Sequence, residues 1–171
     1  MIFQRFFAPG PAKTAGRRLA QSAMAQARAP GLYAVLGAPD TVDGRFELLT
    51  LHVIVLVDRL QDAAVRQALF DAYLADLDGA LREMGVGDLA VGKRMRRLGQ
   101  AFYGRTKSWG AALAALPDDT EASALLGRTV FGGLSQAETK GMARYVAQCH
   151  RALAAQDDAA LASGEVAWPA L

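Results

Sequence analysis

The segment from Gly44 to Gln61 is apolar on nearly every side of a helix, and this constrains the fold more than any other feature. Residues three or four positions apart form one apolar stripe: Phe46, Leu49, Val53, Leu56 and Leu60. Leu48, Leu51 and Val55 make the other sides apolar too. A helix that is apolar all round must be buried on several faces. We therefore place this segment at the centre of a helical bundle, although its β-branched run Val53-Ile54-Val55 is the best strand candidate in the chain.

The rest of the sequence also favours helices. A chain of 171 residues that is rich in Ala and Leu, with 8% aromatic residues, suits one helical domain. The acidic segment from Ala63 to Met84 carries an apolar stripe at helical spacing: Phe70, Tyr73, Leu77, Leu81 and Met84. We predict a further helix over 14–28. Another is expected from Leu89 to about Phe102, with a continuation to Leu116 after a bend at Gly104. Two more follow, one from Asp118 to Gly132 and one after a capping box of Ser135 and Glu138. The expected fold is all-α: a single-domain bundle of about six to eight helices over 14–171.

An apolar and basic N-terminal segment, 1–13, precedes this domain. Its apolar residues flank Gln4 and Arg5: Ile2, Phe3, Phe6 and Phe7. Such a cluster fits a membrane interface, and it fits equally well into the core of its own domain. We expect Pro9, Gly10 and Pro11 to end any helix in this segment.

Two helix boundaries have recognisable capping residues. Gly85 stands where a helix C-terminus requires a positive φ, with Val86 placed to fold back onto Leu81. We predict Asp88 as the N-cap of the following helix. Upstream, we expect Asp40 or Asp43 to cap the central helix.

The helix that follows Asp88 is strongly basic. Between Lys93 and Lys107 the sequence has six cations and no acid, although the net charge of the chain is only +2. This segregation indicates either a docking face for an acidic or phosphate-bearing partner or a solvated surface. Gly92, Gly99 and Tyr103 align along one flank, where glycine permits close approach of a partner or of a neighbouring helix.

No enzymatic site is predicted. The spacing Gly87-x-x-x-x-Gly92-Lys93 imitates a phosphate-binding loop, but residue 94 is Arg where Mg²⁺ needs a hydroxyl, and a helix rather than a strand precedes it. His52 lies in the apolar helix and is more consistent with a hydrogen-bonded core residue than with a ligand. Cys149 is the single cysteine, so we expect a reducing compartment and no disulfide. We therefore predict no catalytic, cofactor-binding or metal-binding residue.

Motifs over Pro30 to Leu116 resemble the ubiquinol–cytochrome c chaperone family. They are GAPDTVDGRFE at 37–47, and LREMGVGDL, GKRMRR and AFYGR between Leu81 and Arg105. Mitochondrial members of that family assist the synthesis and assembly of cytochrome b. The resemblance thus implies an assembly chaperone for the cytochrome bc1 complex that holds cytochrome b during maturation. It brings no catalytic residues.

The residues we predict to bind a partner lie on the basic helix: Lys93, Arg94, Arg96, Arg97, Tyr103 and Arg105. The expected partners are cytochrome b, the ribosome or an anionic inner-membrane surface, and a small protein, but not DNA. The alternative is an adaptor that binds the ribosome or the membrane surface and has no client of its own. The sequence shows no signal-peptide region, so we expect a cytoplasmic location, which includes the inner face of the cytoplasmic membrane.

Overall fold

The computed structural model describes residues 9–133 and 136–171, apart from the side chains of Leu89 and residues 136–138. The helices are α1 (Pro11–Ala27), α2 (Pro30–Ala34), α3 (Val42–Arg59), α4 (Ala63–Glu83), α5 (Asp88–Ala114), α6 (Thr120–Arg128), α7 (Gln136–Ala154) and α8 (Asp158–Ser163). No strand occurs within the described ranges, and Val53-Ile54-Val55 is helical. The predicted all-α bundle is confirmed.

Helix α3 occupies the centre of the bundle, as predicted. Leu48, Val53 and Leu56 have no exposed surface, and the neighbouring helices pack around them. The expected N-cap was wrong, because α3 begins at Val42 and Thr41 therefore occupies the capping position. The Gly44 N–H donates to Thr41 Oγ1 over 3.1 Å, whereas Asp40 instead pairs with Arg45.

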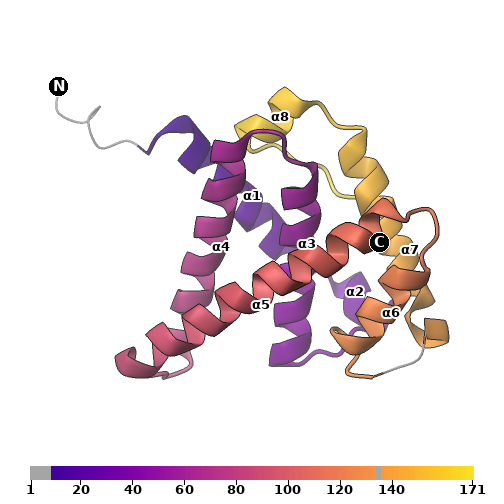
Figure 1. Cartoon of the computed structure of the whole chain (residues 1–171), viewed down its shortest axis with the longest axis horizontal. Helices are drawn as coiled ribbons and strands as arrows, with labels where there is room; N and C mark the ends of the chain where they lie inside the picture. Colours follow the sequence, from indigo (N-terminus) through magenta and orange to yellow (C-terminus); the bar gives the residue numbers. More distant parts are fainter. Residues whose placement is uncertain (1–8, 134–135) are drawn as a thin grey trace.

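The other helices surround α3 (Figure 1). Helices α3 and α4 form a hairpin, α1 packs against both, and α5 runs obliquely across them toward α6 and α7. Helices α1 and α4 touch closely at Gly16, where a Cβ atom would lie 2.4 Å from the backbone carbon of Ala68. Only glycine allows the two backbones to come this near.

The corner between α4 and α5 is a Schellman motif. Gly85 has a φ of 79°, and its N–H donates to the Arg82 carbonyl over 2.9 Å, while the Val86 N–H donates to the Leu81 carbonyl over 3.1 Å. The predicted role of Gly85 is therefore confirmed. The predicted N-cap Asp88 was wrong: Gly87 holds that position, and the Asp88 carboxylate instead pairs with Arg82.

Helix α5 runs without interruption through Gly104 to Ala114, so the predicted continuation beyond Phe102 is confirmed. Buried residues on both sides of the glycine, among them Phe102 and Trp109, anchor the helix to the core and outweigh the low helix propensity of glycine. The expected close packing of Gly92 and Gly99 within the domain was wrong. A Cβ atom at either glycine would meet no atom within 4 Å.

Three other boundaries differ from expectation. Helix α1 begins at Pro11 rather than Thr14, because the fixed φ of proline suits the first helical turn. Helix α6 ends at Arg128, before Gly132 and Gly133 adopt positive φ. The apolar residues of segment 1–8 and the predicted capping box at Ser135 and Glu138 lie outside the described residues and side chains.

Candidate functional site

A groove of about 760 Å³ opens among α1, α3, α4 and α5. Helices α1 and α4 meet at Gly16 and Ala68, and crossing helices separate with distance from their point of contact. Residues of α3 and α5 form the remaining walls of the space between the C-terminal halves of α1 and α4. The apolar lining is Met24, Ala27, Tyr33, Val42, Phe46, Leu49, Leu77, Ala80, Leu81, Met84 and Leu98. We call this space the client groove.

The apolar stripe of α4 extends beyond the core and lines the client groove. Tyr73, in the middle of α4, is buried, but Leu77 and Leu81 are only half-buried and Met84 is 55% exposed. No residue of α4 after Tyr73 is buried. Leaving apolar surface in water costs about 25 cal/mol per Å², so this part of the stripe is suited to covering by another molecule.

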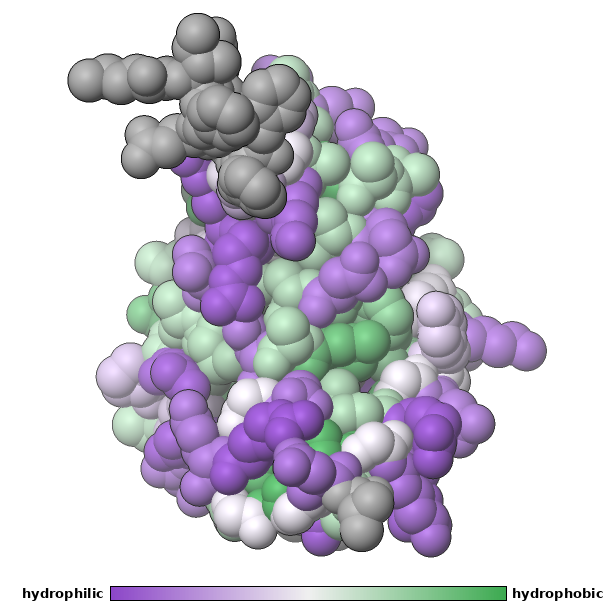
Figure 2. All heavy atoms as spheres, turned by 90° about the vertical axis from the view of Figure 1, so that its left-hand side faces the viewer, coloured by the Kyte–Doolittle hydropathy of each residue, from purple (hydrophilic) through white to green (hydrophobic). Residues whose placement is uncertain are grey.

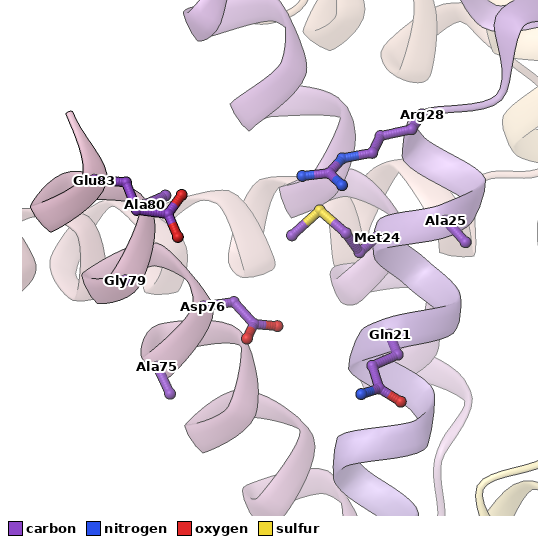
Figure 3. Close-up of a pocket in the computed structure, with 9 residues that line it drawn as sticks. All are labelled: Gln21, Met24, Ala25, Arg28, Ala75, Asp76, Gly79, Ala80 and Glu83. Carbon is purple, nitrogen blue, oxygen red and sulfur yellow. The ribbon is translucent and has the colours of Figure 1, made fainter.

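A second cavity of about 460 Å³ adjoins the groove and shares Met24, Arg28, Asp76 and Ala80 with it. Figure 3 shows Arg28 on α1 and Glu83 on α4 pointing into this cavity from opposite sides. The face of the molecule that carries α4 has a central hydrophobic zone bordered by hydrophilic side chains (Figure 2). The two cavities thus extend along one side of the bundle.

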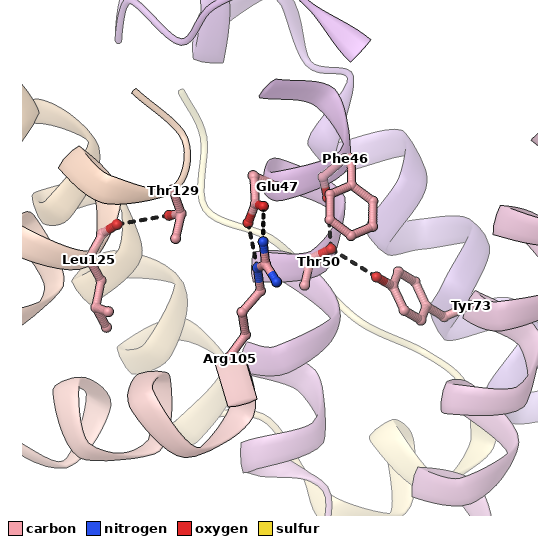
Figure 4. A network of polar contacts seen from close by, with 7 residues as sticks. All are labelled: Phe46, Glu47, Thr50, Tyr73, Arg105, Leu125 and Thr129. Carbon is pink, nitrogen blue, oxygen red and sulfur yellow. Dashed lines mark hydrogen bonds and ion pairs between the residues drawn. The ribbon is translucent and has the colours of Figure 1, made fainter. Parts of the chain in front are cut away.

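Most polar groups of the client groove are already bonded within the domain. Arg105 makes a two-point ion pair with Glu47, in which Nε lies 2.8 Å from Oε2, and its guanidinium carbon lies 5.6 Å from the centre of the Phe46 ring (Figure 4). This hydrogen bond to Glu47 raises the pKa of Arg105. The other bonds are those of Arg45 with Asp40, Asp76 with Arg17, the Tyr33 hydroxyl with the Ala27 carbonyl, and the Thr129 hydroxyl with the Leu125 carbonyl.

Three charged residues of the groove form no ion pair with any described residue: Arg28, Asp43 and Arg94. Asp43 lies in the first turn of α3, where the helix dipole stabilises a negative charge. Arg28 caps the C-terminus of α1, where the dipole stabilises a positive charge. Arg94 lies away from both ends of α5, so its positive charge is compensated neither by an ion pair nor by a helix dipole.

The residues predicted to bind a partner divide between two faces of α5. Arg94 and Arg105 line the client groove, and Arg105 is bound to Glu47 there. Lys93, Arg96 and Arg97 are exposed and do not line the groove. Tyr103 is 67% exposed, with its ring centre 5.7 Å from that of Phe70. We call the exposed surface of Lys93, Arg96, Arg97 and Tyr103 the outer face of α5.

His52 is a core residue bonded on both ring nitrogens. Nδ1 donates to the Leu48 carbonyl over 2.7 Å, since a carbonyl can only accept, and Nε2 therefore accepts from the Tyr145 hydroxyl over 2.7 Å. Gln26 donates to the same hydroxyl over 2.8 Å. Burial lowers the pKa of His52 to about 4 and raises that of the nearby Cys149 thiol to about 12. This histidine has no lone pair left for a ligand.

The apparent phosphate-binding spacing at Gly87 to Lys93 falls on the start of α5, directly after the corner with α4. It therefore lacks the strand and the loop that such a site requires. Among the described residues, no three His, Cys, Asp or Glu side chains gather closely enough for a metal ion. None of the described helices is both long and apolar enough to cross a membrane.

Sequence reasoning missed most of the groove. Its lining comes from segments far apart in the chain, among them Met24, Phe46 and Met84, and no local pattern brings these together. The one available signal was the apolar stripe of α4, which continues to the last residues of the helix.

The comparisons with known proteins agree with this fold. The family model "Ubiquinol-cytochrome C chaperone" matches residues 34–168. The crystal structure of the Cbp3 homolog from Brucella abortus has a TM-score of 0.83 and 35% sequence identity, covering 99% of this chain and 97% of that one. No curated protein matches the chain. A family match over most of the chain and a full-length structural match agree, so the chain belongs to the ubiquinol–cytochrome c chaperone family.

Proposed function

We propose that this protein holds a segment of cytochrome b in the client groove during assembly of the cytochrome bc1 complex. Membership of the ubiquinol–cytochrome c chaperone family supports a role in assembly of this complex. The observation that favours holding is the apolar stripe of α4, whose second half, Leu77 to Met84, lines the groove without being buried. A client segment with apolar side chains covers this surface until the segment reaches its final partners.

We also propose that the outer face of α5 contacts a second, anionic partner. Lys93, Arg96 and Arg97 are exposed, form no ion pair with a described residue and do not line the groove. Their charge suits anionic lipid at the inner face of the membrane, ribosomal RNA, or an acidic surface of a small protein. An adaptor without a client is the rival function, in which this face would bind and the groove would stay empty.

A substitution that fills the groove distinguishes holding of cytochrome b from the adaptor function. Ala80 is exposed and lines both cavities, so Ala80→Trp places a large side chain in the groove without disturbing the core. Ala111, which is exposed on α5 and does not line the groove, gives the matched control Ala111→Trp. Tagged proteins are purified from membranes during active assembly, and co-purifying cytochrome b is measured by immunoblot.

We expect wild type and Ala111→Trp to retain cytochrome b and Ala80→Trp to lose it. Equal recovery with all three proteins would exclude the groove as the holding site. Recovery of ribosomes or of anionic vesicles in the complete absence of cytochrome b would favour the adaptor.

A further inference from the structure

The walls of the client groove determine the backbone conformation of its occupant. Every wall is a helix, whose backbone hydrogen bonds are internal, and the described residues offer no strand edge to which an extended segment could bond. A segment in an apolar groove must therefore satisfy its own backbone groups. A helix does this, and helices commonly dock into grooves by side chains at positions i, i+3, i+4 and i+7.

Arg94 is the one charge in the groove wall that lacks compensation among the described residues. Its neighbours three and four positions away along α5 are Ala90, Val91, Arg97 and Leu98, and none is acidic. Of the three acids in the groove wall, Glu47 is bound at two points by Arg105, Asp76 pairs with Arg17, and Asp43 forms no ion pair with Arg94. Arg94 and Leu98 are one helical turn apart and both line the groove, and Arg94 is exposed to solvent.

A purely apolar occupant would cover Arg94 and remove water from its charge without replacing the lost interactions. A carboxylate on the occupant would instead make charge-assisted hydrogen bonds with the guanidinium. We infer that the client groove selects an amphipathic helix whose apolar face carries one carboxylate positioned against Arg94. This inference rests on the proposed holding function and adds the chemistry by which the groove chooses its client.

The test uses three fluorescent peptides of about 18 residues, long enough to form an isolated helix. They share a Leu- and Ala-rich apolar face and an uncharged polar face, and they differ at one position of the apolar face, which is Glu, Gln or Lys. Binding to the full chain is measured by fluorescence anisotropy. The protein variants are Arg94→Gln, Arg94→Glu and the matched control Arg96→Gln, which alters an exposed arginine outside the groove.

We expect the Glu peptide to bind wild type about two- to fivefold more tightly than the Gln peptide, the upper part of the range of an exposed ion pair. The preference should disappear in Arg94→Gln, persist in Arg96→Gln and shift to the Lys peptide in Arg94→Glu. Circular dichroism verifies that each variant is folded.

The alternative outcomes separate the two proposals. Equal binding of the three peptides to wild type would overturn the carboxylate preference and leave the holding function standing. A Glu preference that persists in Arg94→Gln would overturn the assignment to Arg94. No binding by any peptide to the folded protein would overturn both.

Discussion

At the scale of single residues, His52 is buried and uncharged at the centre of the bundle. Its Nδ1–H is bonded to the Leu48 carbonyl and its Nε2 to the Tyr145 hydroxyl, which in turn accepts from Gln26. The ring also lies edge-on to Trp168, with centroids 5.2 Å apart. This arrangement joins α1, α3, α7 and the C-terminal segment, so the charge state of one ring affects the whole core.

We predict that His52 makes the protein less stable in mild acid. Its pKa is lowered from 6.5 to about 4 in the folded state. As the pH falls, the unfolded chain therefore binds this proton before the folded protein does. Up to about 3 kcal/mol of the stability present above pH 6.5 is lost by pH 4. Urea unfolding is measured between pH 7 and 5, where most carboxylates stay ionised. His52→Gln removes this titration, and an unchanged pH dependence in that variant would contradict the prediction.

Arg105 behaves differently from the other cations of α5. Its side chain is 26% exposed and that of Glu47 only 11%, so removing the arginine leaves a poorly hydrated carboxylate unpaired. We predict that Arg105→Ala lowers the free energy of unfolding by about 1–3 kcal/mol, measured by urea denaturation. Arg96→Ala, at an exposed site, should change it by less than about 0.5 kcal/mol. Equal effects of the two substitutions would show that the ion pair adds no stability.

Some of these residue roles could be predicted from the sequence and others could not. The positive φ of Gly85 follows from local chain geometry, and the burial of His52 follows from its apolar neighbours, so both predictions are confirmed. The partner of Arg105 is Glu47, which lies 58 positions away. The basic run of α5 does not indicate that one of its cations pairs with a carboxylate on α3. Asp88 failed as an N-cap because α5 begins one residue earlier than predicted, which puts Gly87 in the capping position.

At the scale of elements, α5 has two faces with different roles in the structure. One flank carries Arg94, Leu98 and Arg105 toward the client groove, and the outer face carries Lys93, Arg96, Arg97 and Tyr103. The basic run predicts a single binding set that includes Arg94 and Arg105, so the division between two flanks comes from the structure alone. The helical period does not reveal that Gly92 and Gly99 lie in open space, because the position of a neighbouring helix is set by tertiary packing.

We predict that reversing Lys93, Arg96 and Arg97 to Glu leaves the fold largely intact. Exposed substitutions each shift stability by under about 0.5 kcal/mol. Association with anionic vesicles or ribosomes, measured by sedimentation, should be lost in this variant and should weaken steeply with salt in wild type. Binding of the Glu peptide should remain, since these residues do not line the groove. A folded triple variant that still sediments like wild type would remove the outer face from the mechanism.

At the scale of the whole molecule, the groove arises from how the helices cross. The approach of α1 and α4 at Gly16 sets the point from which they separate, and α3 and α5 enclose the resulting space. The sequence predicts the helices because each depends on local spacing of apolar residues. It does not predict the crossing, which depends on contacts between residues about 50 positions apart, such as Gly16 and Ala68.

We predict that deleting the gene lowers the amount of assembled cytochrome bc1 complex while other respiratory complexes persist. A chaperone that covers one client limits only the complex that contains this client. Haem b spectra and ubiquinol–cytochrome c activity of membranes measure the loss, and blue native gels measure the remaining complexes. Reintroduced wild type and Ala111→Trp should restore the complex, whereas Ala80→Trp should not, because its indole occupies the client groove. Normal haem b spectra and normal activity in the deletion strain would show that assembly proceeds without this protein.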